Sequence, residues 1–205
     1  MRIIDMQNDP RRAQFEYFRT FANPYASVTV QCDITPLKDR KPFFLTVLYC
    51  AIQAANSVPE LRRRILDDQV VEFENCLSSH TVALPDESYC YCELDCDKPL
   101  NEFLPYALAE VEKAKTAQSL EDAHPERLFF VTSLPWLSFS SIHLPVPQPA
   151  DSNPRITFGR AYEKDGKYFM PVDLTVHHAL ADGIHIAKFF QKFEENCQSI
   201  DNISI

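Results

Sequence analysis

The chain has 205 residues, 45% of them hydrophobic and 24% charged, and a formal net charge of −9. This length predicts a single domain over residues 1–205 with a full core, and the acidic balance excludes the basic face that a nucleic-acid partner requires. Because only three glycines occur, glycine-rich phosphate loops are excluded as well.

The first half of the chain alternates helical and strand patterns. An aromatic stripe predicts a helix over residues 10–21, and apolar alternation then predicts a strand over residues 28–34. Residues 43–55 are apolar almost all round, which predicts a helix buried in the centre of the fold. Residues 66–93 predict short strands that are broken at Pro85-Asp86.

The second half begins with a third helix, predicted by apolar spacing over residues 100–114, and then turns to strands. These strands are expected over Leu128–Thr132, Trp136–Val146 and Ile156–Tyr162. Asp165-Gly166 predicts a hairpin turn into a last strand, Tyr168–His178, and residues 186–197 carry the stripe of a final helix. This order predicts an α/β fold in which a two-layer mixed sheet is sandwiched with helices, rather than a Rossmann repeat.

The start of the chain and its cysteines predict where the protein works. Arg2 and Asp5 place charges where a secretion signal needs an apolar run, and no apolar stretch reaches the roughly 18 residues of a membrane span. Seven cysteines without such a signal are expected to be free thiols. We therefore expect a cytoplasmic protein that does not bind membranes.

Three histidines and an aspartate follow one another where the last strand meets the last helix. Alternation along the strand places His178 on the face of Val172, Leu174 and Val176, and His177 on the opposite face. An apolar setting favours a neutral imidazole, and a histidine held rigidly at a strand end suits a general base. His178 is therefore the candidate base.

Two other interpretations of this cluster stay open at the level of the residues. Asp182 is also a suitable helix N-cap, with the histidines as hydrogen-bonded core residues. The second interpretation is a metal site built from His178, Asp182 and His185. A strand that ends at His178 argues against it, because these residues would then not share one helix face. The cysteine group is assigned to core packing rather than to a metal; it comprises Cys90, Cys92 and Cys96.

The pattern His-His-x-x-x-Asp-Gly over residues 177–183 is the signature of CoA-dependent acyltransferases, and with His185 it most resembles the type A chloramphenicol acetyltransferases. Further motifs occur in that family's order, which makes the resemblance nearly chain-long. They are Arg11-Arg12 ahead of aromatic residues, Asp33-Ile34-Thr35, Glu60-Leu61-Arg62, Pro135-Trp136 with Phe139, and Thr157.

The resemblance implies roles for individual residues. His178 takes the proton of an acceptor hydroxyl, which attacks the thioester of acetyl-CoA directly in a ternary complex. Asp182 forms a structural ion pair with Arg11. Thr132 stands where the family has a serine that donates to the oxyanion, and Thr157 matches a threonine that acts through a bound water.

The same resemblance implies the co-substrate and the assembly. Acetyl-CoA is a co-substrate, so no tightly bound cofactor and no metal are expected. Arg160 and Thr157 are candidates for binding it, with Tyr162 as a possible partner for its adenine. Members of the family are homotrimers with active sites at the subunit interfaces, and we expect the same here.

The acceptor pocket is where this chain departs from the family. Phe18 replaces a tyrosine, Ala26 replaces a phenylalanine, and Tyr91 aligns with a small residue. The residues expected to bind the acceptor are Tyr17, Phe18, Tyr89, Tyr91, Ile142, Leu144 and Val146.

The leading hypothesis is therefore acetyl transfer to a hydroxyl of chloramphenicol or a related small molecule, which would give antibiotic resistance. One alternative is an acyltransferase for a different small alcohol or thiol. Another, from a different class, is a catalytically silent protein that binds a ligand on the same fold.

Overall fold

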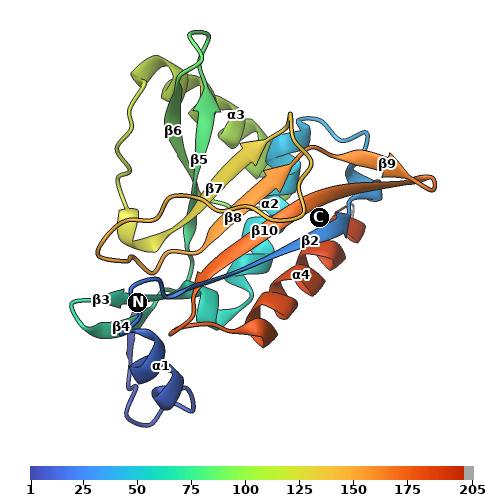
Figure 1. Cartoon of the computed structure of the whole chain (residues 1–205). Helices are drawn as coiled ribbons and strands as arrows, with labels where there is room; N and C mark the ends of the chain where they lie inside the picture. The colour runs from blue at the N-terminus through green and yellow to red at the C-terminus, as the bar shows by residue number, and fades with distance from the viewer. Residues whose placement is uncertain (201–205) are drawn as a thin grey trace.

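The computed structural model of the chain describes residues 1–200, which form one mixed α/β body (Figure 1). Four α-helices are present in this part of the chain: α1 (Arg12–Phe18), α2 (Phe43–Asn56), α3 (Leu100–Ala117) and α4 (Gly183–Gln198). The strands are β1 (Arg2–Ile4), β2 (Tyr25–Asp33), β3 (Arg63–Leu66), β4 (Gln69–Glu72), β5 (Leu77–Ala83), β6 (Tyr89–Leu94), β7 (Leu128–Leu134), β8 (Arg155–Gly159), β9 (Tyr162–Lys164) and β10 (Lys167–His177). Short 3₁₀ turns cover Thr35–Leu37, Pro59–Arg62 and Pro125–Arg127.

The main sheet has seven strands in the order β2-β10-β8-β7-β5-β6, with β9 added to β10 as a hairpin. Strands β5, β7 and β8 run parallel, and the remaining pairs are antiparallel. A second sheet, β1-β4-β3, lies beside α1 at the other end of the molecule (Figure 1). The expected α/β fold class with a mixed sheet is confirmed.

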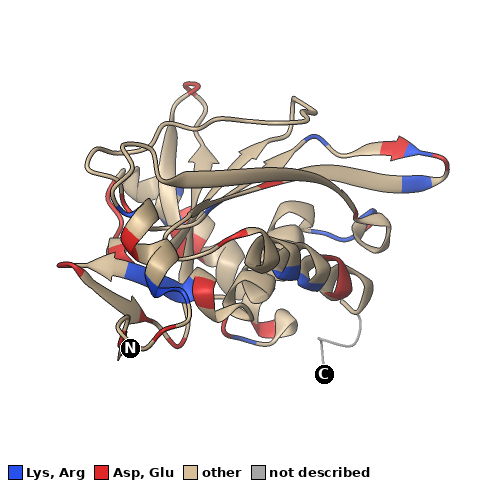
Figure 2. Ribbon diagram, turned by 60° about the horizontal axis from the view of Figure 1, so that its bottom comes forward, with Lys and Arg blue, Asp and Glu red and all other residues tan. Residues whose placement is uncertain are grey.

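One face of the main sheet carries the core. In Figure 2 the helices lie beneath the sheet, while its other face is crossed by the long connection from β7 to β8. Ten of the fourteen residues of α2 are buried, because this helix lies beneath the sheet, beside α4 and in contact with α3. The nearly uniform apolar sequence of residues 43–55 predicted this central position.

The sheet opens between two of its parallel strands. β5 pairs with β7 only from Leu77 to His80, and beyond that point each strand continues with its other neighbour. β5 goes on with β6 as far as Ala83, and β7 goes on with β8 as far as Leu134. The two strands therefore diverge after His80, as Figure 1 shows, and leave space within the sheet.

Three expectations about strands require correction. The strand expected over Ile156–Tyr162 is divided, because β8 ends at Gly159 and β9 begins at Tyr162. Residues 136–146 form no strand, because this segment pairs with no strand in residues 1–200, and Trp136 is 69% exposed. The last strand ends at His177 rather than at His178. The expected hairpin at Asp165-Gly166 is confirmed, with positive φ angles of 52° and 75° at its two residues.

Candidate active site

The turn between β10 and α4 fixes the side chain of His178. Its Nδ1 lies 3.0 Å from the carbonyl oxygen of Ala181, and its backbone N–H donates to the oxygen of Pro24 at 2.7 Å. Because a carbonyl only accepts, Nδ1 must carry the ring proton, which leaves the lone pair on Nε2. The ring is stacked on Phe18, with the centroids 3.9 Å apart. A partly buried imidazole with an unengaged basic nitrogen is the arrangement that a general base needs.

His177, not His178, is the histidine held in the interior. It is 5% exposed, and its Nδ1 accepts a hydrogen bond from the N–H of Ala179 at 3.3 Å. Burial lowers the pKa of His177 to about 4, so the ring is neutral at pH 7. The predicted strand facing was wrong for His178 because the strand ends one residue earlier and the next residue leaves the face of Val176.

An ion pair joins the two ends of the chain at this turn. Arg11 Nη1 donates to Asp182 Oδ2, and Arg11 Nη2 donates to the backbone oxygen of His178 at 3.1 Å. Burial raises the pKa of Asp182, but the hydrogen bond and charge of Arg11 outweigh it and lower this pKa overall. Asp182 is the N-cap of α4, and its own N–H donates to His185 Nδ1 at 3.0 Å. One arginine thus holds both the residue that carries the base and the start of the helix.

Thr132 and Thr157 face one another on neighbouring parallel strands. They are paired in the register of β7 and β8, and Thr157 is in turn opposite Asp173 on β10. Thr157 is 1% exposed and its Oγ1 has no hydrogen-bond partner among the described residues. These two hydroxyl groups therefore lie side by side in the middle of the sheet.

The base and the two threonines do not meet within one chain. His177 is four residues beyond Asp173 along β10, which corresponds to roughly 13 Å of strand. Thr132 lies two strands further across the sheet. The structure therefore separates the predicted site into one group around His178 and another around Thr132.

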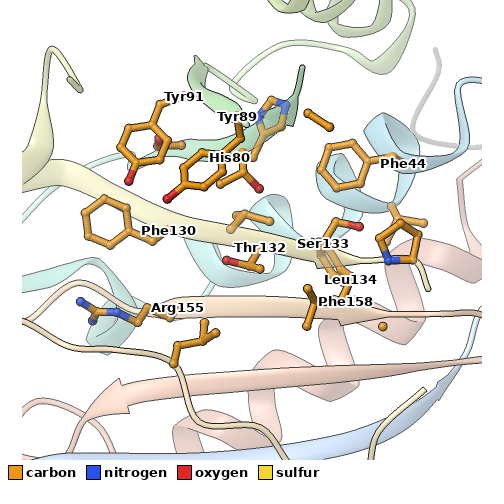
Figure 3. Close-up of a pocket in the computed structure, with 18 of the residues that line it drawn as sticks. Phe44, His80, Tyr89, Tyr91, Phe130, Thr132, Ser133, Leu134, Arg155 and Phe158 are labelled. Atoms are coloured by element: carbon orange, nitrogen blue, oxygen red, sulfur yellow. The ribbon is translucent and has the colours of Figure 1, made fainter. Parts of the chain in front are cut away.

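Thr132, but not Thr157, lines a cavity of about 1360 Å³ that occupies the opening between β5 and β7 (Figure 3). Aromatic rings from several elements surround it, and Thr132 lies among them. Figure 3 shows the rings of Tyr89 and Tyr91 projecting from β6, with Phe44 of α2 on the other side. The volume exceeds the roughly 300–1,000 Å³ of a cleft for one small ligand, so there is room for parts of two molecules.

The remaining predicted site residues are divided between these regions. Leu144 and Arg160 line the cavity, whereas Ile142, Val146 and Tyr162 do not. The hydroxyl of Tyr162 donates to Gln31 Oε1 at 3.1 Å. Tyr17 is exposed on α1, where its ring meets Phe18.

The structure also shows lining residues that the sequence reasoning missed. Phe44 was predicted only as part of a helix, and His80 only as part of a strand, yet both border the cavity. The alternation around His80 carries no signal of this role, because the cavity exists only where β5 and β7 separate.

In residues 1–200 no three His, Cys, Asp or Glu side chains come together in a way that would hold a metal ion. Nor does that part of the chain contain a helix with the length and apolarity to cross a membrane. Lys and Arg residues are interspersed with Asp and Glu around the molecule (Figure 2).

Comparison with known proteins agrees with this geometry. The family profile described as chloramphenicol acetyltransferase matches residues 1–194. The chain belongs to the chloramphenicol acetyltransferase family. It is 30% identical to chloramphenicol acetyltransferase 3 of Escherichia coli over 206 residues, covering 96% of each chain. The expectation of an acetyltransferase of this family is thereby confirmed.

Solved structures agree on the fold. A chloramphenicol acetyltransferase superposes with a TM-score of 0.87 at 26% identity, covering 95% of this chain and 98% of that one. The dihydrolipoamide acetyltransferase of Azotobacter vinelandii superposes with a TM-score of 0.68 at 16% identity, covering 95% and 89%. The second likeness concerns the fold alone.

Proposed function

We propose that the protein transfers the acetyl group of acetyl-CoA to a hydroxyl of chloramphenicol or a related small molecule, with His178 as the general base. The observation that carries this proposal is the bond between His178 Nδ1 and the Ala181 carbonyl, which leaves Nε2 as the basic atom. Membership of the family supports the reaction class.

The transfer proceeds directly between the two substrates. The acceptor hydroxyl gives its proton to His178 Nε2 while its oxygen attacks the thioester carbonyl. The tetrahedral intermediate then collapses, the carbon–sulfur bond breaks, and the departing thiolate takes the proton back from the imidazolium. No step needs a covalent bond to the protein, and all seven cysteines are buried.

Thr132 is the proposed donor to the tetrahedral oxyanion. Its hydroxyl lies in the cavity and has no side-chain hydrogen bond to any residue in 1–200, so it is free to donate. A donor of this kind contributes roughly 10²–10³ in rate. The unpartnered Oγ1 of Thr157, one strand away, suits the proposed role of binding a water beside the intermediate.

The separation of His178 from Thr132 supports a homotrimer with sites at the subunit interfaces. If both residues act on one acetyl group, they must come from different copies of the chain. Trp136 and Leu137, 69% and 59% exposed, offer apolar surface of the kind that a subunit contact covers. In residues 1–200, β2 is an edge strand with one of its sides unpaired.

Acetyl-CoA is proposed to enter the cavity from the side of α2. Arg160 lines the cavity and is exposed, so its guanidinium can pair with a phosphate of the co-substrate. Lys41 immediately precedes the turn into α2 and adds positive charge near Phe43, another lining residue. Such local charge is needed because the chain as a whole carries −9. The seven unpaired thiols suit the reducing cytoplasm, which is the proposed location.

A release assay tests the proposed function. Acetyl-CoA is incubated with the protein, with and without chloramphenicol, and the free CoA thiol is followed with a thiol reagent. Release that depends on chloramphenicol and forms its acetyl ester is the expected result. Release only with another alcohol or thiol would favour an acyltransferase for a different acceptor. The altered residues Phe18 and Tyr91 favour this second candidate. Binding without release under any condition would overturn the proposed reaction.

A further inference from the structure

His80 is a buried histidine in the cavity that none of the proposed catalytic steps uses. It is 3% exposed, and it lies at the last paired position of β5, opposite Val131 of β7. Its ring is 5.2 Å from that of Phe44, centroid to centroid, so it faces the α2 side of the cavity (Figure 3). The strand opening begins at this residue.

One nitrogen of the His80 ring is buried without a hydrogen-bond partner among the described residues. Burial lowers the pKa of His80 to about 4, against which a hydrogen bond to the backbone of Cys92 acts only in part. Nδ1 is buried and has no hydrogen-bond partner in the described chain. A neutral imidazole carries one proton, and with that proton assigned to Nε2 the buried, unpartnered Nδ1 is a bare acceptor.

An unpaired buried acceptor is costly, and such groups are rare in folded proteins. A phenylalanine would fit the aromatic surroundings of Phe44 without that cost. His80 lines the cavity, so a group that enters the cavity can provide the missing donor, and the unpaired nitrogen points to a ligand.

We propose that His80 is a specificity-determining residue, whose Nδ1 accepts a hydrogen bond from an uncharged N–H or O–H donor of the molecule that fills the opening between β5 and β7. A neutral imidazole does not attract a phosphate, so the charged end of the co-substrate is excluded as its partner. This inference rests on the proposed function, which leaves two sources of the donor. They are the amide and hydroxyl groups of the pantetheine arm of CoA, and those of the acetyl acceptor.

The test measures equilibrium binding of CoA and of chloramphenicol separately by titration calorimetry, which does not depend on turnover. His80→Phe and His80→Leu remove the acceptor and keep the site apolar. His80→Asn returns a carbonyl oxygen close to the position of Nδ1. Val82→Ala is the matched control, since Val82 lies two residues along the same strand, is buried in the same core, and does not line the cavity.

The expected result is that the apolar variants bind one of the two probes about 5- to 15-fold more weakly and the other within about 2-fold of wild type. The weakened probe then identifies the source of the donor. His80→Asn should recover most of the affinity, and Val82→Ala should lower the melting temperature without changing either affinity.

Several results would overturn the inference. They are unchanged affinity for both probes in the apolar variants, equal weakening in His80→Asn and His80→Phe, or equal weakening in Val82→Ala. A wild-type protein that binds neither probe would overturn both the proposed function and this inference. If the wild type binds both probes and the apolar His80 variants bind them equally well, this inference alone is overturned.

Discussion

Arg11, just before α1, and Asp182, at the N-cap of α4, form an ion pair although they stand 171 positions apart in the chain. The side chains are 13% and 30% exposed, so the pair is partly withdrawn from solvent. Since Arg11 also bonds the backbone oxygen of His178, the pair constrains the turn that carries the proposed base. Fold stability and activity are therefore coupled at this contact.

A double-mutant cycle on this pair is the first prediction. Asp182→Asn and Arg11→Ala should each lower the free energy of unfolding by about 1–3 kcal/mol, because each leaves its partner without a counter-charge. The double variant should be less harmful than the sum of the two, since both remove one interaction. Urea unfolding gives the three values. Additive losses would show that the two side chains do not interact in solution.

The two neighbouring histidines should respond differently to truncation. His178→Ala should lower kcat by at least about 10² and leave CoA affinity roughly unchanged, as the loss of a general base does. His177→Ala should mainly reduce stability, because it empties a buried site and removes the acceptor for the Ala179 N–H. Steady-state kinetics and thermal unfolding of both variants separate these effects. A larger loss of kcat in His177→Ala would reassign the base.

Local patterns were sufficient for most of the fold. The apolar periodicity of residues 43–55 and the turn at Asp165-Gly166 each depend on neighbouring residues, and both were predicted correctly. Residues 136–146 were not, because alternation indicates a segment suited to strand pairing but does not say whether a partner exists. Among the residues that the structure describes, none does.

The site was harder to predict because it depends on distant register. The position of His178 follows from the end of β10, which the sequence placed one residue too late. The role inferred for His80 depends on where β5 stops pairing with β7, and no spacing in the sequence encodes that separation. Burial of one ring nitrogen without a partner is likewise visible only in three dimensions.

Mixing two inactive variants tests whether subunits share a site. His178→Ala and Thr132→Ala should each be strongly impaired alone. In randomly mixed trimers, a site formed between neighbours has the intact histidine in half the cases and the intact threonine in half. About a quarter of the wild-type activity should therefore return. The variants are denatured, mixed and refolded, with each variant refolded alone as the control. Activity no higher than that of the separate variants would contradict a site shared between chains.

Stability should fall on acidification because of buried histidines. Burial lowers the pKa of His80 and of His177 from 6.5 to about 4. Between these values the unfolded chain takes up protons that the folded protein does not, so the free energy of unfolding decreases as the pH falls through this window. Burial also lowers the pKa of His185, which acts in the same direction.

The expected loss between pH 7.5 and 5.5 is about 1.4 kcal/mol for each of His80 and His177. Urea unfolding at the two pH values measures it. His80→Phe should remove the share of His80 and flatten the dependence, which serves as the internal control. Equal stability at both pH values would show that these rings are not held neutral by the fold.

The acceptor side of the cavity provides the last prediction. Tyr91 lines the cavity with its ring 5.9 Å from that of Tyr89, and Phe18 is stacked on His178. If the ring of Tyr91 crowds the acceptor by about 1–3 kcal/mol, Tyr91→Ala should lower the KM for chloramphenicol about 5-fold or more. Phe18→Tyr, which adds a hydroxyl beside the proposed base, should lower it by about 2- to 13-fold.

The KM for acetyl-CoA is the control for both variants and should stay within about 2-fold of wild type, because neither change removes charge or alters the α2 side of the cavity. Initial rates measured at varied chloramphenicol and then at varied acetyl-CoA provide the two constants. If both variants have a higher KM for chloramphenicol than the wild type, Phe18 and Tyr91 already fit the drug. The departures at these two positions would then be part of a chloramphenicol pocket rather than of a pocket reshaped for another acceptor.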